Sequence, residues 1–296
     1  MPTKTVNLIY PSVNLLYPNN GVGLKTDADV VHAALNKDFV VYHNLPKRCD
    51  IGIHFEIPKI SWWHLFKKNY WFPNPEWTYS YWLKYNKRFT ILAKSLHAFN
   101  IFSGLRFNTI YTGFTSQDRH IAEQDKDEKW LHLIGKSRQK NTEAVIDAFN
   151  YSEPLTIVSH GRADYRSLVE SKNITYIYEY LADEELRALQ NSHKFHICPS
   201  EAEGFGHYIN EARSVGAVII TSDYAPMSEL ITDATGLRVR GHIGESMGLS
   251  NKFEVRSEDI SKAVLAAKKL DTGPAARAAF LRDKTDFETR LKKELI

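Results

Sequence analysis

From about residue 129 onward, short apolar runs alternate with amphipathic segments of helical period, and this alternation constrains the fold more than any other feature. The apolar runs are rich in β-branched residues and predict strands at 130–134, 155–158, 174–178, 195–198 and 217–221. The segments between them predict helices at 142–149, 184–190 and 208–215, with Asn141 and Asp183 as N-caps of the first two. This order of elements predicts a parallel sheet with helices on both faces.

The first half of the chain shows the same alternation less regularly. Strands are predicted at 6–10, 39–42, 51–55, 90–93 and 109–111, and a helix at 27–35 with Thr26 as N-cap. A polar stretch at 114–128 has no hydrophobic period and is typical of a linker. The segment 275–291 predicts a helix whose Phe280, Phe287 and Leu291 share one buried face. We therefore predict two α/β domains, at 1–120 and 121–272, and a C-terminal helix at 273–296.

Composition narrows the class of protein. Hydrophobic residues make up 43% of the 296 residues and charged residues 25%, as in soluble globular proteins. The two cysteines, Cys49 and Cys198, predict a reducing compartment and no disulfide framework, and no Cys/His spacing is typical of a zinc site. No apolar run is long enough for a membrane-spanning helix, and the N-terminus lacks the apolar core of a signal peptide. We expect a cytoplasmic protein of a bacterium or a virus-infected cell.

Charge is distributed unevenly along the chain. Residues 1–120 contain 14 Lys/Arg and 7 Asp/Glu, a balance of +7, whereas the remainder contains 24 and 28, a balance of −4. A basic half predicts contact with an anionic partner. Chance variation in solvated surface charge is the alternative.

Residues 198–212 are the most informative segment. A predicted strand ends at Cys198, a loop with two glycines follows, and a helix begins near His207. Gly204 and Gly206 let the backbone approach a ligand closely, and a helix N-terminus offers free N–H groups to an anion. Seven residues separate Glu203 from Glu211, and such a carboxylate pair can accept hydrogen bonds from vicinal hydroxyls of a sugar or ribose. A capping loop before an amphipathic helix is the alternative.

This segment resembles the signature of family 4 retaining glycosyltransferases, Pro-Ser-x-x-Glu-Gly-Phe-Gly-x-x-x-x-Glu-Ala. The likeness covers about residues 129–240, including 135–141, 216–221 and 225–230, and is loose in the first half. It implies the GT-B fold, in which two Rossmann-like α/β domains face each other across a cleft and a C-terminal helix returns to the first domain. The first domain would then be the acceptor side, and the second would bind the nucleotide-sugar donor.

The resemblance also implies roles for individual residues. Glu211 is expected to bind the nucleotide ribose and Glu203 the donor sugar. Backbone N–H groups around Phe205, Gly206 and His207 would face the sugar and the diphosphate.

Cations are expected beside the diphosphate, because its departure builds up negative charge. The family places an Arg and a Lys after a glycine, and here Lys136, Arg138 and Lys140 occupy that segment. Lys136 stands where the family has Arg and its spacing to Lys140 is shorter than usual, so Arg138 could substitute for either. A solvated basic turn is the alternative.

Further donor-side positions follow from the same resemblance. Tyr178 falls where the base-contacting loop lies, and Glu229 stands at the position of a third acid near the donor, with a helix-terminal charge as its alternative. Gly21 and Gly23 resemble a Gly-rich loop that closes over the donor phosphate. A strand, Gly loop and helix in succession also occur in many other α/β proteins.

Three residues of the first half are acceptor-side candidates. His54 ends a predicted strand and is expected by topology to point toward the cleft, although a core histidine fits equally well. Asn74 and Glu76 lie near the place where the family often has a His-containing loop, and they are candidates for contact with the acceptor or the sugar.

The segment 61–90 contains five of the six tryptophans. They are interleaved with the cations Lys67, Lys68, Lys84, Lys87 and Arg88. Such a combination can stack on sugars or bases, contact phosphates, or anchor a helix at a membrane surface. An aromatic core beneath a basic surface is the simpler alternative. Nucleic-acid binding would weaken steeply with salt, whereas binding of a neutral glycan would not.

We therefore predict a retaining glycosyltransferase that uses a nucleoside diphosphate sugar, UDP- or GDP-linked, without cofactor, metal or obligate protein partner. Asp27-Ala28-Asp29 lies in a predicted helix and Asp125-Lys126-Asp127 in the linker, so neither resembles an Asp-x-Asp metal clamp. The resemblance implies a same-face mechanism in which the leaving phosphate takes the acceptor proton, since no carboxylate is placed as a nucleophile.

Two classes of acceptor are consistent with the sequence. One is a saccharide or lipid-linked glycan, with peripheral membrane contact, and the other is a hydroxymethylated base in DNA, as in phage-type DNA modification. A non-catalytic nucleotide- or sugar-binding module and a nucleotide-sugar epimerase of the same fold are the alternatives to a transferase.

Overall fold

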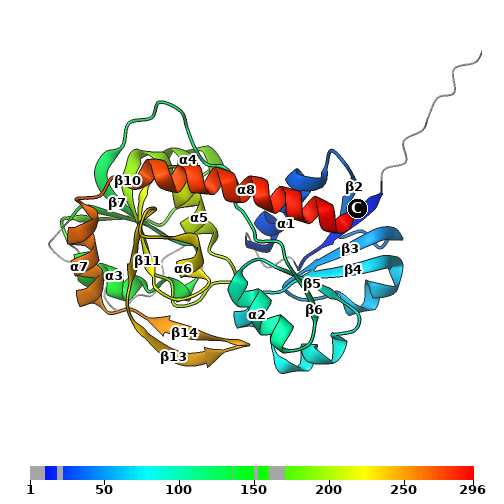
Figure 1. Cartoon of the computed structure of the whole chain (residues 1–296). Helices are drawn as coiled ribbons and strands as arrows, with labels where there is room; N and C mark the ends of the chain where they lie inside the picture. Colours follow the sequence, from blue (N-terminus) through cyan, green and yellow to red (C-terminus); the bar gives the residue numbers. More distant parts are fainter. Residues whose placement is uncertain (1–10, 19–22, 136, 150–152, 160–170) are drawn as a thin grey trace, which may run out of the picture.

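The computed structural model describes residues 11–18, 23–135, 137–149, 153–159 and 171–296 (Figure 1). These residues form two α/β domains, each built on a six-stranded parallel sheet, and a helix that reaches across both. This arrangement confirms the predicted two-domain α/β architecture. Among the described residues, no helix is long and apolar enough to cross a membrane.

The first sheet has the order β2-β1-β3-β4-β5-β6. Its strands are β1 Ser12–Leu16, β2 Val40–His43, β3 Cys49–Phe55, β4 Phe66–Phe72, β5 Thr90–Ala93 and β6 Asn108–Tyr111. Every pairing is parallel, and β1 lies between β2 and β3. The central strands β3 and β5 are largely buried because helices or turns cover both faces of a parallel sheet.

The second sheet has the order β12-β11-β10-β7-β8-β9. Its strands are β7 Asp127–Gly135, β8 Leu155–Ser159, β9 Ile174–Ile177, β10 His193–Cys198, β11 Val218–Ser222 and β12 Leu237–Val239. An antiparallel hairpin, β13 His242–Met247 and β14 Ser250–Glu254, extends from this domain. All five predicted strands of this half are present, with ends shifted by three residues or fewer.

Eight α-helices and four short 3-10 helices join these strands within the described residues. The α-helices are α1 Gly23–Leu35, α2 Leu96–Gly104, α3 Thr142–Phe149, α4 Asp183–Ser192, α5 His207–Ser214, α6 Met227–Leu230, α7 Ser257–Ala267 and α8 Gly273–Leu295. The 3-10 helices are η1 Ile60–Leu65, η2 Pro75–Trp77, η3 Ser80–Tyr85 and η4 Arg138–Lys140.

Helix α8 connects the two domains, and in Figure 1 it runs in red from the second domain to the first. Near its start, Ala276 packs into a core cluster of the second domain, whereas Phe287 and Leu291 pack into the main core of the first domain. Tyr70 of β4 donates a hydrogen bond to the Glu294 carbonyl at 3.3 Å. The predicted helix that returns to the first domain is therefore confirmed, and so is the buried face of Phe280, Phe287 and Leu291.

Some predicted elements need correction. The strand predicted at 6–10 lies outside the described residues, and the first described strand is β1 at Ser12–Leu16. Helix α1 begins at Gly23, one turn before the predicted Thr26 cap. Ala182 rather than Asp183 is the N-cap of α4, since Asp183 is already the first helical residue, and the Asp183 carboxylate is paired with the Arg119 guanidinium at 2.6 Å.

Candidate functional site

The loop between β10 and α5 brings Glu203 next to Lys140. The Lys140 ammonium forms an ion pair with the Glu203 carboxylate, and both side chains are largely shielded, at 13% and 15% exposure. Ser200 donates a further hydrogen bond to Glu203 at 2.6 Å, and the Lys140 ammonium lies 3.7 Å from the centre of the Tyr208 ring. Lys140 comes from η4, which follows β7, the strand next to β10. Two of the predicted site residues are therefore fixed together at the carboxyl ends of neighbouring strands.

Glu211 lies on the first turns of α5, where a buried amide holds its carboxylate. The Gln190 side chain donates a hydrogen bond to Glu211 Oε2 at 2.8 Å, and Gln190 in turn accepts one from Arg119 Nε at 2.9 Å. Arg119 comes from the segment between the two sheets, so this segment helps to position Glu211. The two glutamates of the motif thus flank the N-terminus of α5, as predicted.

The glycines of the loop allow the domains to approach each other closely. Gly206 is the N-cap of α5 with φ +101°, a conformation that side chains disfavour. A Cβ at Gly204 would lie only 2.3 Å from the Asn74 side-chain oxygen of the first domain. Phe205 between them packs against Phe114 at 5.4 Å between ring centroids and belongs to the core of the first domain. The donor-side loop is therefore held against the acceptor-side domain.

A buried polar network crosses the domain boundary at His207, the first residue of α5. His207 Nε2 lies 2.8 Å from Asp27 Oδ1, and Asp27 Oδ2 accepts a hydrogen bond from Lys94 Nζ at 2.6 Å. The Asp27 and Lys94 side chains are only 4% and 2% exposed. Burial opposes ionisation of Asp27, but the Lys94 charge and the His207 contact outweigh it and lower the pKa of Asp27 below its ordinary value.

Asn74, directly before η2, and Glu76, within η2, lie beside this network. Lys94 Nζ donates a hydrogen bond to Asn74 Oδ1 at 2.9 Å. Glu76 is 3% exposed, and its Oε2 is buried without a hydrogen-bond partner among the described residues. Burial raises the pKa of Glu76 to about 8, and the nearby Glu203 and Glu56 charges act in the same direction. Glu76 is therefore protonated at neutral pH.

The hairpin of the second domain closes against η2. The Leu249 N–H donates a hydrogen bond to the Pro75 carbonyl at 2.8 Å, and a Cβ at Gly248 would lie 2.5 Å from the Glu76 carbonyl oxygen. The structure thus brings the predicted residues Glu203, Gly204, Asn74 and Glu76 to one junction between the domains.

Glu229 also joins the two domains. Its carboxylate accepts hydrogen bonds from the Leu96 and His97 N–H groups, both at 2.7 Å, at the N-terminus of α2 in the first domain. Burial raises the pKa of Glu229, against the effect of these two hydrogen bonds. The side chain therefore caps a helix of the opposite domain.

The remaining predicted residues lie elsewhere. His54 is fully buried in β3, with its ring nitrogens 3.1 Å from Asn69 Oδ1 and 3.0 Å from the Lys59 N, and burial lowers its pKa to about 4. The structure therefore places His54 in the core of the first domain, away from the junction.

Tyr178 follows the edge strand β9 and stacks on Tyr176 at 5.8 Å between ring centroids. Arg138 is exposed at the start of η4, and Gly23 is the exposed first residue of α1. Gly21 and Lys136 lie outside the described residues.

Comparison with known proteins identifies the class. Residues 115–253 match the family model described as "Glycosyl transferases group 1". HepE from Anabaena, solved with UDP-glucose, superposes with TM-score 0.68 at 12% identity over 97% of this chain and 98% of that one. The chain is a glycosyltransferase of the GT-B fold. Two further solved structures share this fold. A glycosyltransferase from Rickettsia africae superposes with TM-score 0.65 at 10% identity over 97% of this chain and 98% of that one. The lipopolysaccharide outer core galactosyltransferase WaaB superposes with TM-score 0.63 at 14% identity over 96% of this chain and 99% of that one. No curated protein matches the sequence.

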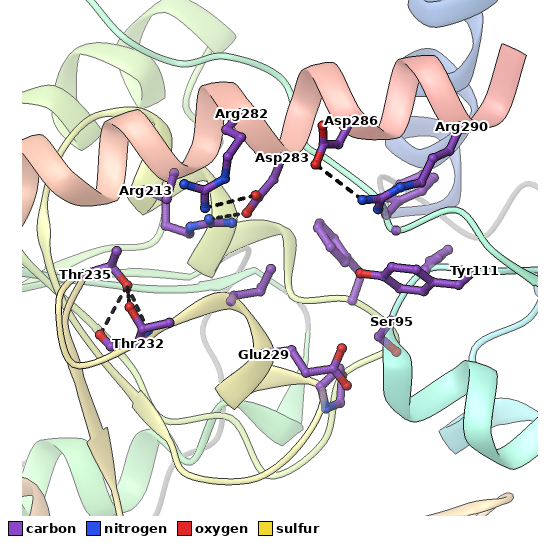
Figure 2. A pocket seen from close by; sticks show the side chains of 17 residues that line it. Ser95, Tyr111, Arg213, Glu229, Thr232, Thr235, Arg282, Asp283, Asp286 and Arg290 are labelled. Atoms are coloured by element: carbon purple, nitrogen blue, oxygen red, sulfur yellow. Dashed lines mark hydrogen bonds and ion pairs between the residues drawn. The ribbon is translucent and has the colours of Figure 1, made fainter. Parts of the chain in front are cut away.

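The glycosyltransferase also has a cavity of about 270 Å³ between its domains, shown in Figure 2. One face of α8 forms one wall of it, and Glu229, Ser95 and Tyr111 lie opposite. In the wall, Asp283 contacts both Arg213 and Arg282, at 2.5 and 3.3 Å. Glu203, Glu211 and Lys140 do not line this cavity, but Phe205 of the motif and Lys94 do, so the cavity adjoins the site around the motif.

Sequence reasoning did not identify Asp27 and Lys94 as site residues. Asp27 lies within a predicted helix, and Lys94 is a single cation directly after a predicted strand. The available signal was the position of Lys94, because a charged residue right after an apolar strand lies at the carboxyl edge of a parallel sheet. Among the described residues, no group of three or more His, Cys, Asp and Glu side chains is placed to hold a metal ion.

Proposed function

We propose that the enzyme transfers a sugar from a nucleoside diphosphate sugar to an acceptor hydroxyl with retention of configuration, as a member of family 4. The observation that carries this proposal is the arrangement around α5. Glu203 and Glu211 flank a glycine loop and a helix N-terminus, and Lys140 is ion-paired with Glu203 at the edge facing the first domain. A helix N-terminus with a nearby lysine suits a diphosphate, and paired carboxylates suit the hydroxyls of sugar and ribose.

The donor would lie along the loop and the start of α5. Glu211 would accept hydrogen bonds from the ribose hydroxyls, and Glu203 from the donor sugar. The N–H groups of Phe205, Gly206 and His207 would face the diphosphate. Tyr178, at the carboxyl end of β9, would lie near the base. We expect UDP as the nucleotide because HepE was solved with UDP-glucose, with GDP as the alternative.

Cations would stabilise the leaving diphosphate. Lys140 is fixed by Glu203 and by the Tyr208 ring, so its charge is already in position when the bond breaks. Arg138 lies two residues earlier on the same turn, and Arg138 or Lys136 would provide the second positive charge. We propose that these side chains perform the charge stabilisation without a metal ion, which a chelator added to the assay would test.

The state of Glu76 favours a same-face mechanism. A carboxylate nucleophile on the acceptor side would have to be ionised, whereas burial keeps Glu76 protonated at neutral pH because its pKa is about 8. The leaving phosphate would then take the acceptor proton. Protonated Glu76 can instead donate a hydrogen bond to a sugar or acceptor hydroxyl.

The acceptor is proposed to be a saccharide hydroxyl, on a free or lipid-linked glycan. A hydroxymethylated base in duplex DNA is the second candidate, because residues 1–120 carry a charge of +7, from 14 Lys/Arg and 7 Asp/Glu.

A donor panel tests the proposal directly. Release of UDP or GDP from different nucleotide sugars would be followed with saccharide acceptors, with hydroxymethylated duplex DNA, and with neither. We expect Glu211→Ala to abolish release and transfer while the protein stays folded. Glu258→Gln, an exposed glutamate on α7, is the matched control and should keep the wild-type rate. Wild-type transfer by Glu211→Ala would refute the donor site.

A further inference from the structure

Exposed aromatic and basic side chains gather on one part of the first domain. We call this part the aromatic–basic surface. Its rings are Trp63, Trp77, Tyr79 and Tyr81, which are 37%, 42%, 50% and 56% exposed. Its exposed cations are Lys59, Lys68, Lys84, Lys87 and Arg88. Large aromatic side chains normally contribute to the core, so this number of exposed rings beside cations indicates a binding surface.

The residues of the aromatic–basic surface come from two segments, 59–68 and 77–88, which form a single surface. Ile60 of η1 and Trp82 and Leu83 of η3 pack against the same core cluster around Trp71 and Phe89. The Arg88 guanidinium lies over the Trp63 ring at 4.2 Å and so bridges the segments. The turns η1 and η3 are thus anchored on a core beneath them, next to the exposed rings.

The charge of this surface is almost entirely positive. Between residues 57 and 90 the only acid is Glu76, which is buried and protonated at neutral pH because its pKa is about 8. A sixth cation, Lys67, is paired with Asp50 at 2.6 Å, so its charge is neutralised. None of the five cations forms an ion pair with a described residue, so the surface presents them next to four amphipathic rings and complements an extended anionic partner.

The ring faces argue against nucleic acid as that partner. Binding of single-stranded nucleic acid relies on bases stacking on open aromatic faces. Tyr79 and Tyr81 instead stack on each other at 6.1 Å with an interplanar angle of 10°, and Arg88 covers a face of Trp63. Tyrosine and tryptophan edges beside lysines are the combination that lies at the headgroup level of a bilayer.

We propose that the aromatic–basic surface docks the enzyme onto a bilayer that contains anionic phospholipids. The rings enter the headgroup region, and the five cations contact the lipid phosphates. Trp77 belongs to the same 3-10 turn as Glu76, so a docked bilayer lies next to the acceptor side of the site. If the proposed function holds, this position favours an acceptor carried on a lipid.

Vesicle flotation tests the docking with the full chain. Vesicles of phosphatidylcholine alone would be compared with vesicles that also contain phosphatidylglycerol, at low and high salt. We expect flotation only with the anionic vesicles and its loss at high salt. The double variant Tyr79→Ser with Tyr81→Ser should abolish flotation with the anionic vesicles. The double variant Lys84→Gln with Lys87→Gln should weaken the affinity for these vesicles roughly fivefold per lysine. The matched control is Lys262→Gln with Lys268→Gln on the second domain, which should float like the wild type.

The same preparations separate this proposal from the proposed function. Donor hydrolysis by the tyrosine variant should equal that of the wild type, so a failure of donor chemistry would not affect the flotation result. The proposal is overturned if the anionic vesicles do not bind, if the control pair weakens binding as much as the lysine variants, or if duplex or single-stranded DNA binds this surface and vesicles do not.

Discussion

At the scale of single residues, the site depends on charges that are buried in pairs. Lys140 with Glu203 and Lys94 with Asp27 are both shielded from water, so each charge depends on its partner. The first pair lies within the second domain, whereas the second pair belongs to the first domain and reaches the second through His207.

Lys140→Ala is expected to remove charge stabilisation from the leaving diphosphate. Because the ammonium is preorganised by Glu203 and Tyr208, we expect kcat to fall at least about a hundredfold. Steady-state kinetics with circular dichroism as a check on folding would measure this. A variant that is folded and retains its kcat would contradict the role of Lys140.

Asp27→Asn is expected to leave the Lys94 ammonium buried without its counter-charge. The cost should be about 3–5 kcal/mol of the free energy of unfolding, measured by urea denaturation. The double variant Asp27→Asn with Lys94→Met removes both charges and should recover part of that loss. If the single variant is as stable as the wild type, the pair does not matter for stability.

Glu76 is expected to make stability depend on pH. Its pKa of about 8 in the folded protein lies above the ordinary value of 4.5, so the folded state holds more protons between these values. The stabilisation from the neutral form is complete below about pH 4.5 and is lost as pH rises through 8. Relative to Glu76→Gln, the wild type should lose up to about 1.4 kcal/mol per pH unit in this window. Parallel stability curves for the two proteins would rule this out.

At the scale of elements, the second half of the chain was predictable because each buried strand is a short apolar run between helical segments. The predicted ends of α3 match the structure at both residues. In the first half, β4 was missed because Lys67, Lys68 and Asn69 interrupt its apolar residues, although they lie in the strand. Helix α2 was missed because its nine residues mix apolar side chains with His97, Asn100 and Ser103, so no apolar stripe stands out in the sequence.

Contacts between elements far apart in sequence account for what the sequence did not reveal in the site. The loop after β10 and its two glutamates could be predicted from the local motif. The pairing of Asp27 with Lys94 joins residues 67 positions apart, and their link to His207 joins residues 180 positions apart. No local pattern encodes such contacts. The first arises only when the first domain folds, and the second only when the two domains pack together.

Gly204→Ala tests how closely the loop after β10 must approach the first domain. A Cβ there would lie 2.3 Å from Asn74 Oδ1, so Asn74 or the loop must move, and Asn74 is already hydrogen-bonded to Lys94. We expect a several-fold rise in the KM for the donor and a lower melting temperature. Gly104→Ala, where a Cβ meets nothing within 4 Å, is the control and should change neither quantity appreciably. Equal behaviour of the two variants would show that the close approach is not required.

At the scale of the whole molecule, the domains share a core as well as a boundary. Phe205 of the second domain is 5% exposed and lies among residues of the first domain's main cluster. Around it, Glu229 caps α2, and the hairpin contacts η2. The donor loop and the packing between domains are therefore parts of one assembly.

Phe205→Ala is expected to loosen this assembly. Removing a buried phenylalanine side chain should cost about 3–5 kcal/mol in urea denaturation. The radius of gyration from small-angle X-ray scattering should also increase, because the ring packs between the domains. Leu281→Ala, at an exposed position of α8, is the control for a neutral truncation. A Phe205→Ala protein as stable and compact as this control would refute the shared core.

Helix α8 has a consequence for synthesis of the protein in the cell. Phe287, Leu291 and Leu295 complete the core that β1 and α1 begin, yet they are made more than 250 residues later. While the chain is being translated, the first domain must keep an apolar face uncovered until this last helix leaves the ribosome. The first domain is thus completed only after the second domain has been synthesised, and nascent chains that stall before α8 should be the ones that require chaperones.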